Sequence, residues 1–440
     1  MKMAGRAAFY TLGCKVNQNE TENLAALFRE RGYEIVDPKE EADVYILNTC
    51  TVTHLADRKS RNFIRRAVKA NPQAKVVVMG CYAQISPQEI RKIPGVSLVV
   101  GTSERTRILE WLDSHQDKRG PACLVRDIRE QKKFDEIFEE VEPDKVSERA
   151  RAYLKIQEGC DQYCSYCIIP YARGPVRSRT LESTLRAAGA LIKAGYKEIV
   201  LTGIHLGAYG SDFAGKIRLE ALLEKLLSIT PEVRWRLSSL EPTEVSRDLV
   251  DLMASHKNFC PHLHLPLQSG HDEILRAMNR PYTTADYQEV LRQVRKRIPG
   301  ICITTDIMVG FPGETDKHFQ AYLEFTAKMA FSNMHVFQYS PRRGTQAAGF
   351  PYQIPSPAKE ARSRQLLELA SAMAHEYARG FLGKTLQILA ETKVDEALWE
   401  GHSDNYLKVA FSSEKVQRGE IVPITLLKAE GKNCQGVIAI

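Results

Sequence analysis

The N-terminal quarter of the chain alternates short apolar runs with longer stretches of helical periodicity. The apolar runs lie at residues 8–12, 44–48, 75–80 and 97–101. Between them, apolar residues recur with the period of an amphipathic helix over about residues 19–31 and 55–69. Strands that alternate with helices in this way predict a parallel α/β sheet.

The middle of the chain repeats a strand followed by a helix. The predicted strands are residues 152–157, 198–203, 233–239, 262–267, 301–310 and 333–339. Right-handed crossovers between such strands curl a parallel sheet into a barrel, with the chemistry at the carboxyl ends of the strands. Six units predict a partial (β/α)6 barrel that is open enough for a large substrate.

The pattern changes again near the C-terminus. From about residue 380, apolar and polar residues alternate around Gly-containing turns, which predicts a small antiparallel β-barrel of the OB type. A charge-dense stretch before the central barrel lacks apolar periodicity and predicts a linker or a crossing strand. The expected N-terminal sheet domain, linker, central barrel and C-terminal β-barrel cover residues 1–117, 118–147, 148–378 and 379–440.

Composition adds a prediction about location. The 440 residues are 43% hydrophobic and carry a net charge of +7, which is ordinary for a globular protein. The N-terminus lacks a signal-peptide pattern, and no apolar run reaches the ~18 residues that a membrane span requires. We therefore expect a cytoplasmic protein. In a reducing compartment its ten cysteines indicate metal or catalytic sites rather than disulfides.

Three cysteines follow predicted strands of the N-terminal sheet. Cys14, Cys50 and Cys81 each stand just after one of these strands. The carboxyl ends of parallel strands line one edge of an open α/β sheet, where ligands bind. We therefore expect these three thiols to meet in space although they lie far apart in the sequence.

Three further cysteines, Cys160, Cys164 and Cys167, lie in one short segment with the spacing C-x3-C-x2-C. A structural zinc site takes four ligands, so this segment is one ligand short. Its spacing also differs from that of bacterial ferredoxins, which give every iron a thiolate. The remaining interpretation is a four-iron cluster held at three irons, with the fourth iron open to an exogenous ligand.

With Tyr166 before its last cysteine, this segment resembles the signature of radical S-adenosylmethionine enzymes. The resemblance implies that the open iron binds the amino and carboxylate groups of S-adenosylmethionine. It also implies that an electron from the reduced cluster cleaves this molecule to a 5′-deoxyadenosyl radical, which abstracts hydrogen from a C–H bond.

The sequences TLGCKVNQNETE, LNTCTVT and VMGCYAQ resemble the N-terminal domain of the methylthiotransferases within that superfamily. With a TRAM-like C-terminal domain, the resemblance covers essentially the whole chain. It implies that Cys14, Cys50 and Cys81 hold a second cluster on the sulfur side of the reaction. The expected cofactors are two 4Fe-4S clusters and S-adenosylmethionine, a further copy of which donates the methyl group of the methylthio product.

The same segments look like the subgroup that modifies N6-threonylcarbamoyladenosine of tRNA at C2 of the adenine, beside the anticodon. Relatives that act on isopentenyladenosine usually read GCQMN at the first cysteine, and those that act on a ribosomal-protein aspartate read GCPKN. Lys15 and Val16 depart from both patterns, and both substrates stay as alternatives. The expected partners are the anticodon stem-loop of tRNA, a low-potential electron donor and a sulfur donor, with no membrane.

Two functions of other kinds compete with this interpretation. A non-enzymatic iron–sulfur protein that binds RNA or carries electrons would explain the basic runs at 58–69 and 170–179 but not two missing fourth ligands. A radical enzyme that adds carbon without sulfur is the other. The basic runs themselves are either solvated faces or contacts to an RNA backbone.

Polar residues and glycines at the ends of the predicted barrel strands are candidates for binding S-adenosylmethionine, because glycine permits close backbone approach and polar groups supply hydrogen bonds. These candidates are Thr202, Gly203, Ser238, Ser239, Glu241, Gln268, Ser269, Gly270 and Gly310. We expect His262 and His264 to be hydrogen-bonded in the barrel interior rather than to bind metal. The remaining cysteines, Cys123, Cys260, Cys302 and Cys434, are expected to be structural. Arg173, Arg177 and Arg179 either contact phosphate or fix the cluster loop.

Overall fold

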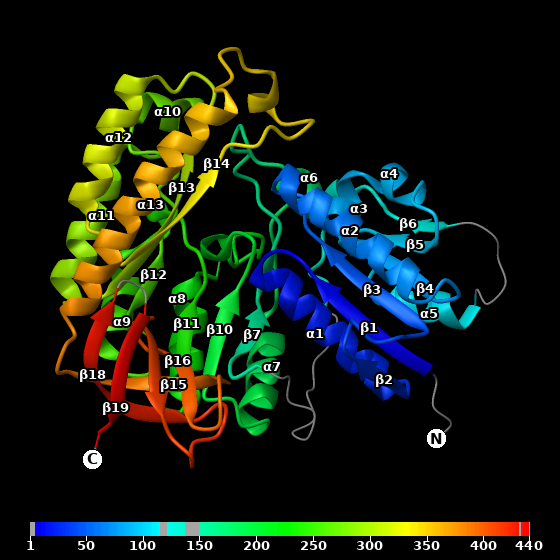
Figure 1. Cartoon of the computed structure of the whole chain (residues 1–440), viewed down its shortest axis with the longest axis horizontal. Helices are drawn as coiled ribbons and strands as arrows, with labels where there is room; N and C mark the ends of the chain where they lie inside the picture. Colours follow the sequence, from blue (N-terminus) through cyan, green and yellow to red (C-terminus); the bar gives the residue numbers. More distant parts are fainter. Residues whose placement is uncertain (1–4, 115–120, 137–148, 216, 431–432, 440) are drawn as a thin grey trace.

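The computed structural model describes residues 5–114, 121–136, 149–215, 217–430 and 433–439. An N-terminal sheet, coloured blue to cyan in Figure 1, lies beside a larger α/β barrel, and a small β-barrel lies below the latter. This arrangement confirms the predicted fold class. None of the described helices is long and apolar enough to cross a membrane.

The N-terminal sheet has six parallel strands in the order β2-β1-β3-β4-β5-β6. Its strands are β1 (Gly5–Thr11), β2 (Tyr33–Val36), β3 (Val44–Thr49), β4 (Lys75–Gly80), β5 (Val96–Val100) and β6 (Ala122–Leu124). Its helices are α1 (Lys15–Glu30), α2 (His54–Ala70), α3 (Cys81–Ile85), α4 (Pro87–Arg91) and α5 (Arg107–Ser114). Successive side chains of a strand point to opposite faces, so Tyr45 packs with Ile64 of α2, whereas Ile46 packs with Phe28 of α1.

Two strands of this sheet do not follow from the apolar pattern. β2 lies at the sheet edge and only half buries its side chains, so its sequence shows little apolar signal. β6 has three residues and lies within the stretch 118–147. Its Cys123 is exposed. The rest of that stretch falls partly outside the described residues.

The barrel has six parallel strands in two groups of three, β7-β10-β11 and β12-β13-β14. Isolated parallel bridges, Trp235 to Phe259 and Ser239 to His264, connect the two groups. The strands are β7 (Ala152–Lys155), β10 (Glu198–Thr202), β11 (Arg234–Leu237), β12 (His262–His264), β13 (Cys302–Val309) and β14 (Asn333–Gln338). All six strands predicted from the sequence are present, which confirms the partial barrel.

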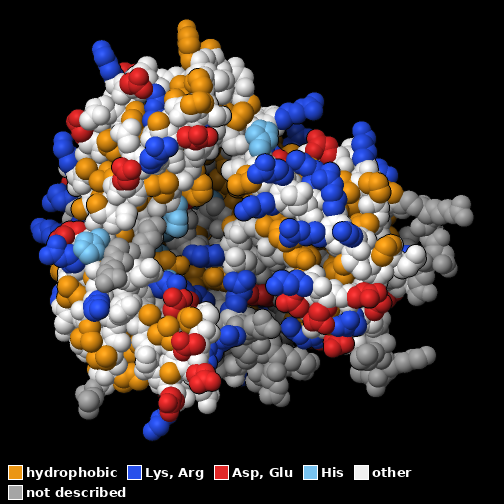
Figure 2. Space-filling view, viewed as in Figure 1, with side chains coloured by type: hydrophobic (Ala, Val, Ile, Leu, Met, Phe, Trp, Pro, Cys, Tyr) orange, Lys and Arg blue, Asp and Glu red, His pale blue; other side chains and the backbone are white. Residues whose placement is uncertain are grey.

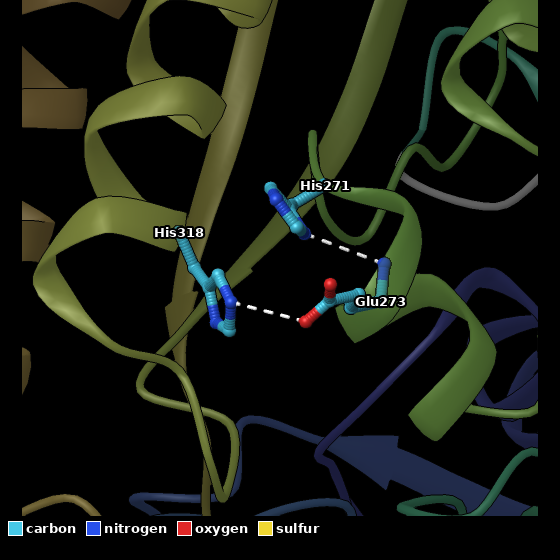
Figure 3. A group of neighbouring side chains, drawn as sticks. All are labelled: His271, Glu273 and His318. Atoms are coloured by element: carbon cyan, nitrogen blue, oxygen red, sulfur yellow. Dashed lines mark hydrogen bonds and ion pairs between the residues drawn. The ribbon is translucent and has the colours of Figure 1, made fainter.

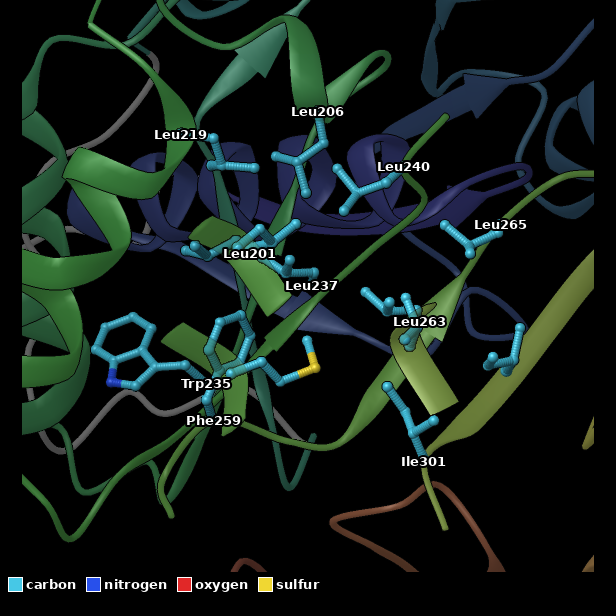
Figure 4. Packing of buried hydrophobic residues seen from close by; sticks show 14 of the residues in the cluster. Leu201, Leu206, Leu219, Trp235, Leu237, Leu240, Phe259, Leu263, Leu265 and Ile301 are labelled. Carbon is cyan, nitrogen blue, oxygen red and sulfur yellow. The ribbon is translucent and has the colours of Figure 1, made fainter. Parts of the chain in front are cut away.

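Amphipathic helices cover the outside of this barrel. They are α7 (Leu181–Lys193), α8 (Leu219–Ile229), α9 (Arg247–Ser255), α10 (Asp272–Ala277), α11 (Thr284–Arg297), α12 (Asp316–Met329) and α13 (Ser356–Arg379). Figure 4 shows part of the core, in which Leu201, Leu237 and Leu263 of the strands lie among further leucines, Trp235 and Phe259. Between β7 and α7 lie β8 (Gln157–Glu158), α6 (Ile169–Arg173) and β9 (Arg177–Ser178).

The C-terminal barrel closes in the order β15-β16-β17-β19-β18. Its strands are β15 (Thr385–Lys393), β16 (Leu398–Ser403), β17 (Lys408–Ser412), β18 (Ile421–Glu430) and β19 (Asn433–Ile438). Neighbouring strands are antiparallel, as predicted, except that β17 and β19 are parallel. Strand directions cannot alternate all the way round a closed ring of five, so one parallel pair is unavoidable.

Candidate functional site: two cysteine triads at one domain interface

The first triad consists of Cys14, Cys50 and Cys81, which follow the adjacent strands β1, β3 and β4. Cys50 and Cys81 are buried and Cys14 is exposed. The three thiols are close enough to interact electrostatically with one another. Gly13 permits this approach, because a Cβ on it would lie 3.1 Å from the Cβ of Cys50.

The second triad consists of Cys160, Cys164 and Cys167, in the loop between β8 and α6. The loop is held by its backbone: Cys160 N donates to Gly174 O at 3.0 Å and Cys167 N donates to Cys164 O at 2.9 Å. Gly159, just before it, has φ +77°, and a Cβ there would lie 1.8 Å from a carbonyl oxygen. Only glycine fits this position.

The chemistry of both triads suits a polynuclear cluster. Burial raises the pKa of Cys81 and of Cys167 to about 12, so these thiols stay protonated until a metal takes the proton's place. Each triad offers three soft sulfur donors, and cysteine thiolates are the usual ligands of iron–sulfur clusters.

Charged side chains support the sulfur atoms of the second triad. Arg280 Nη1 donates to Cys164 Sγ at 3.2 Å, and its Nη2 pairs with Glu241. His205 Nδ1 lies 3.7 Å from Cys160 Sγ, while its Nε2 pairs with Glu244 at 2.6 Å. Burial alone would lower the pKa of His205, but these contacts raise it to about 10. The imidazole thus lies between the sulfur of Cys160 and the carboxylate of Glu244.

A buried ionic network connects the two triads across the domain interface. Glu20 of α1 and Glu158 of β8 are both paired with Arg173, the last residue of α6. Lys155 and Arg105 pair with the same carboxylates. Arg173 also donates from Nε to Cys81 Sγ at 3.2 Å. The helix that follows the second triad thus contacts the first.

The predicted S-adenosylmethionine residues lie where the barrel strands end, in differing environments. Thr202 and Ser238 are buried, Ser239 is exposed, and Ser238 Oγ is buried without a hydrogen-bond partner among the described residues. Such an orphaned hydroxyl fits a polar ligand in the barrel mouth. Glu241 is already paired with Arg280.

Two of the predicted glycines have close neighbours that leave no room for a side chain. A Cβ on Gly203 would lie 2.8 Å from the side chain of Gln157, and one on Gly310 would lie 2.4 Å from Lys359. Gln268 has φ +63°. Ser269 and Gly270 are buried behind it.

The second basic run is not a phosphate-binding surface. Arg173, Arg177 and Arg179 are all at most 5% exposed. Arg177 donates to Arg173 O and Pro175 O, so it fixes the cluster loop. Of the two predicted alternatives, the structure therefore favours the structural one.

The first basic run, on α2, is exposed. Its Arg58 and Arg61 line a cleft of about 1400 Å³ that is also lined by α4, by Ile168 of the cluster loop and by residues 342–344. Figure 2 shows the Lys and Arg side chains gathered over α2. Arg342 lines this cleft and is held in place because its Nη2 donates to Thr51 at 2.7 Å and to Asp57 at 2.6 Å.

The histidines of the barrel strands are hydrogen-bonded. His262 and His264 both contact Thr304 Oγ1, at 3.2 and 2.9 Å, as expected for a hydrogen-bonded interior. A separate surface group of His271, Glu273 and His318 has its ligand atoms within 4.8 Å of one another (Figure 3). Nδ1 of each histidine accepts a backbone N–H, and Nε2 of His318 lies 3.2 Å from the carboxylate of Glu273. These side chains cap helices.

Sequence reasoning missed several residues of the site. Arg105, His205, Arg280 and Arg342 carried no motif or spacing signal, whereas Asn17 lies within the segment TLGCKVNQNETE but was not singled out. These four residues reach the cysteines, or the interface between them, only through the tertiary fold, whereas Asn17 is three residues from Cys14. Cys260, Cys302 and Cys434 are buried away from both triads, as expected of structural residues.

Comparisons with known proteins agree with this architecture. Residues 6–101 match the uncharacterized protein family UPF0004, and residues 154–326 match the radical SAM superfamily. The threonylcarbamoyladenosine tRNA methylthiotransferase MtaB of Bacillus subtilis is 42% identical over 96% of this chain and 94% of its own length. The tRNA-2-methylthio-N(6)-dimethylallyladenosine synthase of Moorella thermoacetica is 33% identical over 96% of this chain and 95% of its own length.

Among solved structures, the radical S-adenosylmethionine methyltransferase TsrM from Kitasatospora setae superposes with a TM-score of 0.58. The two chains are 16% identical, and the match covers 79% of this chain and 77% of that of TsrM. At this identity the match supports the fold alone. The superfamily match implies a 4Fe-4S cluster and S-adenosylmethionine as cofactors. With both regions matched and relatives similar over the full length, the chain belongs to the methylthiotransferases of the radical S-adenosylmethionine superfamily.

Proposed function

We propose that this enzyme inserts a methylthio group at C2 of N6-threonylcarbamoyladenosine, next to the anticodon of tRNA. The observation that carries the proposal is the similarity, over 87 to 96% of the chain, to three threonylcarbamoyladenosine tRNA methylthiotransferases, at 36 to 42% identity. Relatives named for dimethylallyladenosine are 32 to 33% identical. The reaction also needs a low-potential electron donor and a sulfur donor.

Within this proposal, the second triad holds the cluster that binds S-adenosylmethionine and the first triad holds a second 4Fe-4S cluster on the sulfur side. When bound, these groups supply a 5′-deoxyadenosyl radical and the sulfur chemistry. The first triad fits this assignment because it offers three converging thiols, two of them buried, at the edge of the sheet that faces the barrel.

The chain's own residues orient and shield these groups. Arg280 and His205 fix two sulfur atoms of the second triad, each through a contact to Sγ. Ser238, with its unpartnered hydroxyl, and the backbone at Gly203 are proposed to hold S-adenosylmethionine at the barrel mouth. The buried ionic network between α1 and β7 closes this side of the interface to water.

The tRNA is proposed to lie along α2 and the adjoining cleft. Arg58, Arg61, Arg65 and Lys69 follow one another at helical spacing on one face of α2, and this stripe begins in the cleft. In the described chain, Arg58, Arg65 and Lys69 make no ion pair with protein, so their charges are available to phosphates. Because α2 begins shortly after Cys50, the stripe starts near the first triad.

The nucleosides of tRNA from a strain that lacks the gene test the substrate. We expect mass spectrometry to show N6-threonylcarbamoyladenosine without its methylthio group, and the group to return when the wild-type gene is restored. An unchanged threonylcarbamoyladenosine pool, with loss of methylthio from dimethylallyladenosine or from a ribosomal protein, would contradict the assignment.

A further inference from the structure

Arg173 lies close to the second triad in the sequence, but its side chain contacts a cysteine of the first triad. It ends α6, six residues after Cys167, and its side chain is fully buried. From there it crosses the domain interface, where Nε donates to Cys81 Sγ at 3.2 Å. Once Cys81 ligates a metal as a thiolate, this contact is a charge-assisted hydrogen bond, which is shorter and stronger than a neutral one.

The same guanidinium reaches a second cysteine indirectly. Its Nη2 donates to Oδ1 of Asn17, and that oxygen lies 3.6 Å from Cys14 Sγ. Asn17 is in turn fixed by its amide, which donates to Leu12 O at 2.8 Å and to Thr49 O at 3.3 Å. A protonated Cys14 thiol donates to Oδ1 of Asn17 but a thiolate ligand cannot, so the contact of Arg173 that applies to a bound cluster is the direct one to Cys81.

The opposite side of the guanidinium is anchored in the ionic network. Nη1 donates to Glu20 at 2.6 Å and to Glu158 at 3.0 Å. These two carboxylates come from α1 of the N-terminal sheet and from β8 of the barrel. Because both anchors are buried, the planar fork of Arg173 is held in one orientation relative to Cys81.

We propose that Arg173 is a positioning residue for the cluster of the first triad, through which the barrel's cysteine loop sets the geometry and electron density of Cys81. This inference rests on the second cluster of the proposed function. Donors to ligating sulfur raise the reduction potential of an iron–sulfur cluster, and partners of the ligands typically change metal affinity by about 10- to 100-fold.

The test uses the full-length chain with Cys160, Cys164 and Cys167 changed to Ala, so that all bound iron belongs to the first triad. After anaerobic reconstitution this parent is expected to hold about four iron atoms per chain. In the same background, Arg173→Gln is expected to lose iron to a chelator about 10- to 100-fold faster and to show a lower midpoint potential by low-temperature EPR.

Arg105→Gln is the matched control. Arg105 is equally buried and pairs with the same Glu20, at 3.1 Å, and with Glu158, at 3.9 Å, but its contacts are with carboxylates rather than cysteine. It is expected to lower thermal stability while leaving chelator kinetics and potential at the parent values. Arg173→Lys keeps the positive charge beside both carboxylates without the fixed Nε–H donor, and is expected to fold yet still release iron faster.

If the Arg105 and Arg173 variants lost iron to the chelator at the same rate, Arg173 would act only as part of the ionic network, and the inference would be wrong. Parental behaviour of Arg173→Lys and Arg173→Gln would overturn it as well. A parent that binds no iron at all would instead remove the second cluster, and with it the sulfur side of the proposed function. None of these measurements involves tRNA, so the substrate assignment is tested separately.

Discussion

Arg280 donates to the sulfur of Cys164 at 3.2 Å, although 116 residues separate the two in sequence. The guanidinium is buried, its Nη2 is paired with Glu241, and its Nε donates to the hydroxyl of Tyr282 at 3.1 Å. This contact has the same form as that of Arg173 with Cys81. Each triad thus includes a cysteine that accepts a hydrogen bond from a buried arginine.

Arg280→Gln is predicted to impair the second triad selectively. The substitution removes the charged donor to Cys164 and leaves the partly buried Glu241 without its partner, so reductive cleavage of S-adenosylmethionine should fall about 10- to 100-fold. 5′-Deoxyadenosine formed by reconstituted protein is the measurement. Arg276→Gln, on the exposed face of α10, is the control and should cleave at the wild-type rate. Wild-type cleavage by Arg280→Gln would contradict the role given to this arginine.

The two triads are predicted to be separable by single cysteine substitutions. Cys164→Ala should abolish cleavage of S-adenosylmethionine and all methylthio product, because the second triad then holds its cluster by only two sulfur atoms. Cys14→Ala should keep 5′-deoxyadenosine formation while stopping sulfur insertion. Both products can be quantified in one anaerobic assay with tRNA. Loss of cleavage in Cys14→Ala would show that the triads do not act separately.

The stripe on α2 is predicted to set the salt dependence of tRNA binding. Changing Arg58 and Arg65 to Gln removes two exposed charges that have no ion-pair partner in the described chain. The slope of log affinity against log salt concentration should become shallower by about one for each phosphate that the protein no longer neutralises. Filter binding over a salt series measures this slope. Lys296→Gln, which removes an equally exposed charge on α11, should leave it unchanged. An unaltered slope in the double variant would place the tRNA elsewhere.

Glu198 is predicted to make the junction between the two barrels acid-sensitive. Burial alone would raise its pKa, but Arg234, Arg236 and Arg151 outweigh burial and hold the pKa of Glu198 well below its usual range. Two of these arginines also bind the C-terminal barrel, since Arg234 donates to Gln387 O at 2.8 Å and Arg236 to Ser403 O at 3.0 Å.

Because the pKa of Glu198 is lower in the folded protein than in the unfolded chain, the protein loses stability as the pH falls. Stability from Glu198 is fully present above its unfolded-state pKa of about 4.3 and is lost as the pH falls towards the folded value. Glu198→Gln should lower the free energy of unfolding by about 3–5 kcal/mol at neutral pH, because it leaves the arginines without their partner. It should also make this free energy fall less steeply between about pH 7 and 3, as measured by urea unfolding. Glu232→Gln, on the exposed turn before β11, should behave as wild type. If the free energy of unfolding of Glu198→Gln fell with pH as steeply as that of the wild type, this account would be wrong.

The sequence by itself determined the elements whose signal is local. The spacing of Cys160, Cys164 and Cys167 lies within one loop, so it could be recognised without knowing the fold. The first triad needed one further rule, that parallel strands present their carboxyl ends together, and the structure places Cys14, Cys50 and Cys81 after three adjacent strands. The six barrel strands followed from their repeated apolar runs.

Only the tertiary structure decided which charged residues serve these cysteines. The run at 170–179 reads as a basic surface, yet Arg173, Arg177 and Arg179 are buried: Arg173 against Glu20 of the N-terminal sheet domain, Arg177 against its own loop and Arg179 against Ser183. The α2 run is also basic but stays exposed. Burial and partner choice depend on how α1 packs against β7, and this docking brings together residues with no shared period or spacing in the sequence.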